Sequence, residues 1–423
     1  MCHAVPCSPE GTLRKASLYV CYYDLGEPLV QTQVLPYLRA LVADGFEIHL
    51  LTFERRSLAH ADRQRARASL LQSGIRWSSL RYHAWPSLPA TVYDIVVGTG
   101  WTLAYCLRHR IRIVHARSHV PAAIGLVAKR LLGCRLLFDM RGLLAEEYVD
   151  AGHWSATGLK FRLTKAMERL FFRDADAIVM LTRRIKAELT RQEPVLLARG
   201  DDIEVIPCSV DTTRFRMSST ERDVFRAARG WTDRLVLAYV GKLGTWYLPR
   251  EMAAFFAALK RAHPRAYFAV LTQSPSELMR SALREEGIGT EDADVGYVAP
   301  EQIPISLAAC DAGISFIRSS YSKRASSPTK VGEYLAAGLP VVTNAGIGDL
   351  DALFDGSGVG VVTQAFDRAD LDRAAETLLR IVAEPSTHEG CRALASRELG
   401  LDTVGGPRYV ALLRRLAGLG GHR

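Results

Sequence analysis

Short apolar runs alternate with helix-forming segments along nearly the whole 423-residue chain, and this alternation constrains the fold more than any other feature. Residues 17–23 and 46–53 are apolar runs, and residues 30–43 between them carry apolar side chains at helical spacing. A strand, a helix and a strand in this order form a βαβ unit, which begins a parallel sheet. The same alternation restarts at residues 235–240. The sequence therefore predicts an α/β protein with two parallel sheets.

One stretch, residues 326–344, combines a loop, a short helix and a buried strand. Ser327 is a suitable N-cap, Pro328 suits the first helical position, and Gly338 suits the end of the helix. The free N–H groups and the dipole of a helix N-terminus favour an anion. A cation in the first turn opposes that dipole, so a bound anion would compensate for Lys330.

Glu333 follows within the next turn, where its carboxylate can accept hydrogen bonds from hydroxyl groups of a ligand whose phosphates lie at the helix start. The alternative is an ordinary surface helix whose lysine and glutamate are solvated. Residue chemistry alone leaves both interpretations open.

Two further strand exits carry polar side chains, and ligands of open α/β sheets gather beyond the carboxyl ends of strands. Residues 117–119 leave one strand, and residues 139–142 leave the next. Asp139 could accept a proton from an acceptor or simply pair with Arg141. His119 is a further candidate catalytic residue, although a loop or core histidine is the commoner case.

Composition places the chain among ordinary globular proteins, with 48% hydrophobic and 23% charged residues. No apolar run is long enough to span a membrane, and the first 14 residues contain no signal-peptide core. None of the eight cysteines forms a Cys-x-x-Cys pair, so neither a zinc site nor a disulfide framework is indicated. These features predict a reduced, cytoplasmic protein.

The net charge of +9 is concentrated in the first half, where residues 1–205 hold 28 Lys and Arg against 20 Asp and Glu. Such a basic half suggests an anionic partner, although a basic solvated surface is an equal alternative. No nucleic-acid-binding motif occurs, so nucleic acid is not predicted as a partner. The mixed basic and apolar segment 159–173 suits either an interfacial membrane helix, and thus peripheral attachment to the cytoplasmic face, or packing against the sheet.

The block from Ser326 to Asp349 resembles the donor motif of the retaining glycosyltransferases with the GT-B fold, family-four type, and element order resembles that family over nearly the whole chain. The resemblance implies two Rossmann-like domains facing across a cleft: an acceptor domain at 1–215, a donor domain at 216–402, and a last helix within 403–423 that packs back. It also implies transfer of a sugar from a nucleoside diphosphate to a hydroxyl acceptor, with retention of anomeric configuration. The basic first half favours an acceptor that is lipid-linked or anionic, in polysaccharide, glycolipid or glycoconjugate biosynthesis, and a natural-product acceptor is the alternative.

The resemblance assigns roles to particular residues. Glu333 would hold the nucleotide ribose, and the residues before it would hold the diphosphate together with the glycine-rich turn after strand 235–240. The donor-binding candidates are Gly241, Lys242, Gly244, Tyr297, Val298, Ser326, Ser327, Pro328, Thr329, Lys330 and Glu333. The acceptor-side candidates are Gly26 and Gln33, and the catalytic candidates are Asp139, Arg141 and His119.

The chain departs from the family pattern at three positions. Ala325 stands where the first of two acidic residues is usual, Asp139 stands where a histidine is common, and the second lysine of the glycine-rich turn falls near Trp246 or Tyr247. These departures keep two alternatives open: a nucleotide-sugar epimerase or hydrolase, and a non-catalytic nucleotide-sugar binder. Electrostatic stabilisation of the diphosphate by Lys242, Lys330 and the helix start predicts a metal-independent reaction without a cofactor, although Asp349 and Asp351 form an Asp-x-Asp pair in a loop.

Overall fold

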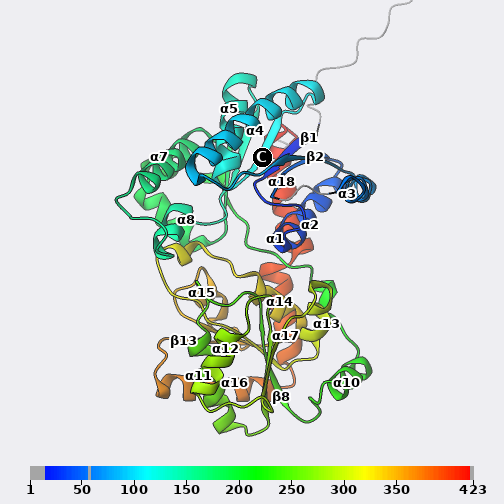
Figure 1. Ribbon diagram of the computed structural model, residues 1–423, viewed down its shortest axis with the longest axis vertical. Coiled ribbons are helices and arrows are strands. Elements are labelled where there is room, and N and C mark those ends of the chain that lie inside the picture. Colours follow the sequence, from blue (N-terminus) through cyan, green and yellow to red (C-terminus); the bar gives the residue numbers. More distant parts are fainter. Residues whose placement is uncertain (1–14, 56–58, 420–423) are drawn as a thin grey trace, which may run out of the picture.

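The computed structural model describes residues 15–55 and 59–419, which form two layered α/β domains (Figure 1). Each domain has one parallel sheet with helices on both faces. The predicted fold class, two Rossmann-like domains of the GT-B type, is confirmed.

The N-terminal sheet has seven strands in the order β3-β2-β1-β4-β5-β6-β7. Its strands are β1 (Ala16–Cys21), β2 (Glu47–Glu54), β3 (Ile75–Arg81), β4 (Ile113–Arg117), β5 (Arg135–Asp139), β6 (Ala177–Met180) and β7 (Ile203–Val205). Its helices are α1 (Pro28–Gln33), α2 (Leu35–Ala43), α3 (His60–Gln72), α4 (Ser87–His109), α5 (His119–Leu132), α6 (Leu144–Asp150), α7 (Leu159–Asp174), α8 (Arg183–Gln192) and α9 (Pro194–Leu197).

Alternate residues of these strands face opposite layers, as the pleat requires. Tyr19 and Leu50 face α1 and α2, whereas Leu18 and Leu51 face α4 and α5. Strands β1 and β6 are buried along their whole length and are mostly apolar, which explains why the sequence predicted them clearly, whereas the edge strand β3 is polar and partly exposed.

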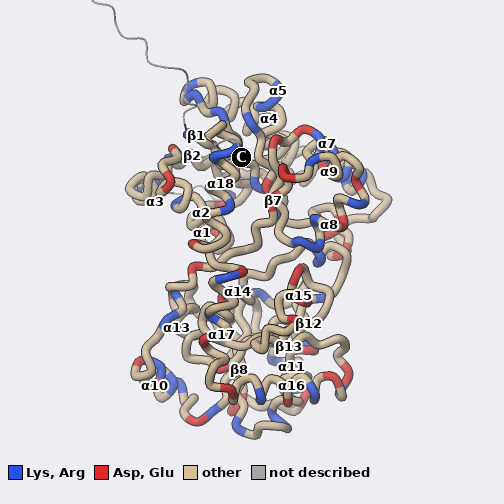
Figure 2. Tube along the Cα trace, turned by 180° about the vertical axis from the view of Figure 1, so that it is seen from behind, with Lys and Arg blue, Asp and Glu red and all other residues tan. Residues whose placement is uncertain are grey.

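The C-terminal sheet has six strands in the order β10-β9-β8-β11-β12-β13. Its strands are β8 (Leu235–Val240), β9 (Ala266–Leu271), β10 (Ala293–Gly296), β11 (Ala312–Ser315), β12 (Val341–Asn344) and β13 (Gly360–Thr363). Its helices are α10 (Ser219–Ala228), α11 (Pro249–Ala262), α12 (Glu277–Glu285), α13 (Ile303–Ala308), α14 (Thr329–Ala337), α15 (Leu350–Phe354), α16 (Arg368–Ala383) and α17 (Thr387–Leu394). Acidic and basic residues are interspersed over this domain (Figure 2).

The chain crosses between the domains twice. It enters the C-terminal domain after β7, and it returns after α17 to end in α18 (Gly406–Leu416), which lies beside α2 in the N-terminal domain (Figure 1). The ring of Tyr409 lies 5.0 Å from that of Tyr37, and Arg414 pairs with Asp44. The two domains are therefore joined by two covalent connections.

Strand order reverses between β1 and β4 in the first sheet, and between β8 and β11 in the second. A crevice opens at the carboxyl ends of the strands at such a reversal, because the flanking connections turn to opposite sides. The loops after β1 and β4 thus meet the loops after β8 and β11 across the space between the domains.

The expected single helix over residues 30–43 is wrong in detail, because the structure breaks it at Val34 into α1 and α2. Pro36 explains the break, since it has no amide hydrogen for the carbonyl one turn earlier.

Candidate active site

A cleft of about 280 Å³ lies between the domains at the two strand reversals. Tyr23, Arg117 and Arg141 line it from the N-terminal domain, and Tyr247 and Lys323 line it from the C-terminal domain. The backbone segment of Ser326, Ser327, Pro328 and Thr329 forms part of its floor. The structure thus brings the predicted donor segment next to one predicted catalytic residue, Arg141.

Asp139, the last residue of β5, has no exposed surface and does not line the cleft. Its carboxylate lies 3.5 Å from the Arg141 guanidinium, 3.7 Å from that of Arg117 and 3.5 Å from His115 Nε2. Burial by itself raises the pKa of Asp139, but Arg141, the hydrogen bond with His115 and Arg117 together hold that pKa well below its usual range.

The carboxylate of Asp139 therefore stays ionised and is a weak proton acceptor. Its geometry fits the pairing alternative, in which Asp139 positions two arginines that line the cleft. Burial by itself lowers the pKa of Arg141, but Asp139 reverses this and raises it well above the usual value, so Arg141 remains cationic.

His119 faces away from the cleft. Its Nε2 lies 3.1 Å from Glu168 Oε2 on α7, and its ring contacts Phe138 and Phe171. This position matches the commoner role of a core histidine, which joins α5 to α7, and gives His119 no contact with a substrate in the cleft.

Helix α14 begins one residue later than expected, with Pro328 rather than Ser327 at the N-cap. Proline has no side-chain acceptor, so the first amides of the helix have no side-chain cap. The Ser327 hydroxyl instead accepts a hydrogen bond of 3.0 Å from the amide of Cys208 in the connection between the domains.

Lys330 lies buried under the glycine-rich turn. Its ammonium donates a hydrogen bond of 3.1 Å to Tyr239 and lies 3.5 Å from the ring centroid of Tyr247. No carboxylate of the described chain lies within ion-pair distance of it. Burial lowers the pKa of Lys330 well below its usual value, while Glu333 acts in the opposite direction.

The turn that covers this ammonium needs glycine at Gly241. Its φ is +119°, and a β-carbon added there would lie 3.3 Å from Lys330 Nζ. Gly244 also has positive φ, at +81°. The side chain of Lys242 is exposed and has no hydrogen-bond partner among residues 15–55 and 59–419.

Glu333 is half-buried, and burial raises the pKa of its carboxyl against the opposing effects of Lys330 and Arg214. Within the described ranges its carboxylate has no hydrogen-bond donor, which leaves both oxygens available to a ligand. Tyr297 is exposed, whereas Val298 is buried in the core, so only the former offers a side chain to a base.

The two acceptor-side candidates differ. Gly26 lies in an exposed turn with open space around it. Gln33 is buried: its side-chain amide donates to the Ser209 carbonyl at 2.9 Å, and its backbone carbonyl accepts a hydrogen bond from Arg117 at 3.3 Å. Gln33 therefore holds the segment that connects the two domains, through its hydrogen bond to Ser209, and does not face an acceptor.

Sequence reasoning missed the pair formed by Lys323 and Glu147. Their side chains lie 3.0 Å apart across the cleft, and Lys323 Nζ lies 3.8 Å from the ring of Trp246. Both residues occur in segments without a recognisable motif, and only the approach of the domains pairs them.

Ala325, at the position where an acidic residue is usual, is buried against the N-terminal domain with Met140 and Leu143. A carboxylate at this position would lie in an apolar contact between the domains. The alanine at position 325, where the family usually has an acidic residue, is thus suited to its apolar surroundings.

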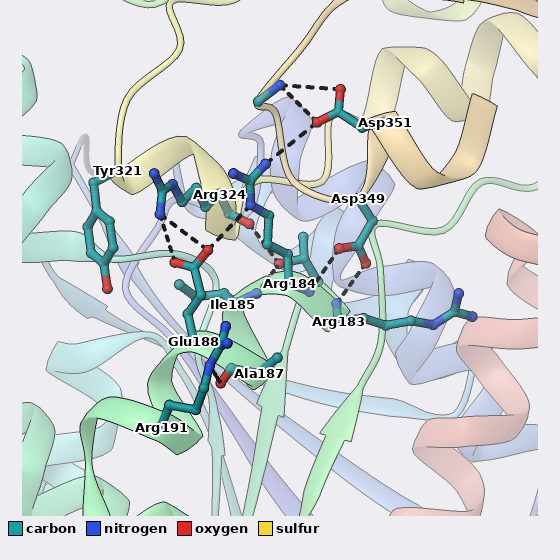
Figure 3. Close-up of polar contacts among 12 residues, drawn as sticks. Arg183, Arg184, Ile185, Ala187, Glu188, Arg191, Tyr321, Arg324, Asp349 and Asp351 are labelled. Carbon is teal, nitrogen blue, oxygen red and sulfur yellow. Dashed lines mark hydrogen bonds and ion pairs between the residues drawn. The ribbon is translucent and has the colours of Figure 1, made fainter. Parts of the chain in front are cut away.

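The loop after β12 joins the domains on another side, as Figure 3 shows. Asp349 accepts hydrogen bonds from the amides of Arg183 and Arg184 at the start of α8, at 2.7 and 2.9 Å. Asp351 accepts from the Gly346 amide at 3.0 Å and pairs with Arg184 at 3.6 Å. Both carboxylates of the Asp-x-Asp pair, Asp349 and Asp351, therefore already accept hydrogen bonds from protein groups.

We expect Asp349→Ala to favour separation of the domains, because α8 loses acceptors that only the C-terminal domain supplies. Loss of a helix cap costs about 0.5–2 kcal/mol. Small-angle scattering should show a larger radius of gyration, together with a lower Tm. Asp367→Ala is the matched control, because Asp367 caps α16 within one domain; an equal expansion in that variant would contradict the prediction.

Among residues 15–55 and 59–419, no group of three or more His, Cys, Asp or Glu side chains is arranged to hold a metal ion. None of their helices is long and apolar enough to cross a membrane. Metal independence stays a prediction.

The two facing Rossmann-like domains, with the cleft at their strand reversals, define the GT-B class of glycosyltransferase folds. Residues 30–214 match the family model Glycosyltransferase Family 4. This match and the fold confirm the resemblance to family-four GT-B glycosyltransferases, and the part that matches the family model lies in the N-terminal domain.

Solved structures agree with this fold. Anabaena HepE in complex with UDP-glucose is 16% identical with a TM-score of 0.66, over 96% of this chain and 100% of that one. A glycosyltransferase from Rickettsia africae is 11% identical with a TM-score of 0.70, over 95% and 98%. WaaG, a glycosyltransferase involved in lipopolysaccharide biosynthesis, is 15% identical with a TM-score of 0.65, over 96% and 100%. No curated protein matches the sequence.

Proposed function

We propose that this protein transfers a sugar from a nucleoside diphosphate sugar to a hydroxyl acceptor with retention of anomeric configuration. The observation that carries the proposal is the buried Lys330, which has no carboxylate partner in the described chain and lies beneath Gly241 at the start of α14. A buried cation without a counter-ion is costly, and a diphosphate at this position would supply the missing charge.

The residues around Lys330 suit the other parts of such a donor. Glu333, one turn along α14, has carboxylate oxygens available for ribose hydroxyls. Lys242 and the uncapped amides of α14 can stabilise charge that develops on the departing diphosphate. This arrangement supports a reaction that needs neither a metal nor a cofactor. The complexes of HepE with UDP and with UDP-glucose support the same class of donor.

The acceptor half of the proposal depends on the opposite wall of the cleft. Arg117 and Arg141, held by the buried Asp139, line that wall as cations. These groups favour an acceptor that is anionic or linked to a lipid phosphate, as in polysaccharide, glycolipid or glycoconjugate biosynthesis.

The epimerase or hydrolase alternative requires acid and base groups facing the cleft from the N-terminal domain. Of the two candidates, Asp139 is buried and ion-paired, and His119 faces α7. A non-catalytic binder would have the same donor site and would differ from an enzyme only in the lack of turnover. Donor binding and sugar transfer must therefore be measured separately.

The first test is thermal unfolding with a panel of UDP-, GDP-, ADP- and dTDP-sugars in the presence of a chelator. One donor should raise the Tm, because a ligand at 100 times its Kd stabilises by about 2.7 kcal/mol. Glu333→Ala should lose that shift. The control Glu376→Ala, an exposed glutamate on α16, should retain it.

Absence of a shift with every nucleotide, in a folded protein, would contradict the donor site. A shift without sugar transfer to any acceptor would favour the non-catalytic binder. Release of the sugar or its isomer without an acceptor would favour the hydrolase or epimerase.

A further inference from the structure

Helix α4 carries its apolar face on the outside of the protein. Trp85, just before the helix, is 87% exposed, and Val96 is 64% exposed. The members of this surface, termed the α4 patch, are Trp85, Leu88, Val92, Tyr93, Val96 and Val97. Their spacing places them along one side of the helix.

The opposite side of α4 is made of small and polar residues. Ala90, Asp94, Gly98, Thr102 and Cys106 are buried at intervals of four. Gly98 lies against α5, because a β-carbon there would come within 2.7 Å of Ile124. Since close packing takes up this side, α4 cannot rotate to bury the α4 patch within its own domain.

The exposed charges of the segment that carries the α4 patch, residues 81–110, have one sign. Arg81 is exposed just before the patch, and Arg108 and Arg110 are exposed at the C-terminal end of α4. Between residues 81 and 110 the sole acidic residue is Asp94, which is buried and accepts a hydrogen bond of 2.6 Å from Tyr22.

The start of α7 extends the α4 patch. Lys160 Nζ lies 3.2 Å from Ser87 Oγ, which places Leu159, 74% exposed, beside the first turn of α4. Helix α7 was the sequence-based candidate for an interfacial helix. Its Phe171 and Phe172 are buried, so packing accounts for the C-terminal part of its apolar face, whereas Leu159 and Leu163 are exposed.

We propose that the α4 patch docks the protein on an anionic lipid surface. Trp and Tyr side chains favour the boundary between lipid and water, and flanking arginines and lysines add attraction to anionic headgroups. Two copies of this chain meeting through their α4 patches would bring basic rims together, so charge disfavours a dimer there. The proposal rests on no part of the proposed donor chemistry.

The test is co-sedimentation of the full chain with vesicles of phosphatidylcholine alone or with roughly one-third phosphatidylglycerol. Binding should require the anionic lipid and weaken as salt increases. Val92→Asp with Val96→Asp should reduce the partition coefficient on the order of tenfold or more, because an aspartate is costly to bury in lipid. Val224→Asp, at an exposed valine on α10 of the other domain, should bind as the wild type does.

A second variant, Arg81→Gln with Arg108→Gln, leaves the apolar side chains intact. In this variant, vesicle binding should depend less on the salt concentration. Thermal unfolding and circular dichroism identify any variant that fails to fold. Three results would overturn the proposal: no sedimentation with either vesicle, sedimentation unchanged in the aspartate variant, or a dimer in light scattering that this variant dissociates. The last result would assign the α4 patch to a second copy of the chain.

Discussion

Replacement of Asp139 by alanine is expected to lower the free energy of unfolding by about 3–5 kcal/mol, the usual cost of removing one partner from a buried ion pair. Asp139 is fully buried between Arg117 and Arg141, whose side chains are 3% and 10% exposed. Without the carboxylate, two guanidinium groups face each other at the end of the sheet with no counter-ion. Urea or thermal unfolding measures the loss.

The control for Asp139 is Asp372→Ala, which removes an exposed carboxylate paired with Arg261 and Arg368. Exposed pairs contribute less than about 1 kcal/mol. A loss at Asp139 as small as in this control would contradict the proposed role of the ion cluster. Asp139→Asn should be destabilised as well, because the amide keeps the shape but not the charge.

The stabilisation from Asp139 should also depend on pH in a defined way. Because folding depresses the pKa of this carboxyl, the unfolded chain takes up its proton first as the pH falls. The contribution is therefore complete above the ordinary aspartate pKa of about 4 and decreases only below it. The difference in unfolding free energy between wild type and Asp139→Asn should be constant at neutral pH and shrink in acid.

The second large effect is expected at Lys330. Lys330→Met should weaken donor binding by about 10- to 150-fold, which corresponds to loss of a charge-assisted interaction of about 1.5–3 kcal/mol. The same variant should be more stable than the wild type without ligand, because methionine avoids the burial that lowers the lysine pKa. Lys330 would then reduce stability in exchange for donor binding.

Proton uptake distinguishes this role from a packing role. The donor diphosphate should raise the depressed pKa of Lys330, so binding takes up a proton between the two pKa values and weakens as the pH rises. Titration calorimetry in buffers of different ionisation enthalpy measures this uptake. In the unliganded protein the opposite dependence holds, because the unfolded chain binds more protons there and stability increases with pH.

Lys242→Met is the matched control for Lys330, because Lys242 is exposed in the same turn. It should weaken donor binding without altering proton uptake. Proton uptake that persists in Lys330→Met would contradict the assignment of that proton to Lys330.

The sequence predicted the architecture because central strands such as β1 and β8 are buried on both faces and are therefore mostly apolar. It also identified the segment 326–344 and the turn at Gly241, because glycines at turns and apolar runs are local signals, although it placed the N-cap of α14 one residue too early, at Ser327. Errors occurred where a single residue changed a helix, as Pro36 did between α1 and α2.

The sequence by itself thus determined the two parallel sheets, the order of their strands and helices, and the helix and turn predicted to bind the donor. Only the tertiary structure placed Lys330 beneath Gly241, paired Lys323 with Glu147 across the cleft, and buried Asp139 between two arginines. The physical reason is the distance along the chain over which each signal acts. Backbone geometry and burial patterns repeat over a few residues, whereas the exposure and partners of a side chain depend on segments that come together only when the chain folds, such as Tyr239 beside Lys330, 91 residues away, or Glu147 beside Lys323, 176 residues away.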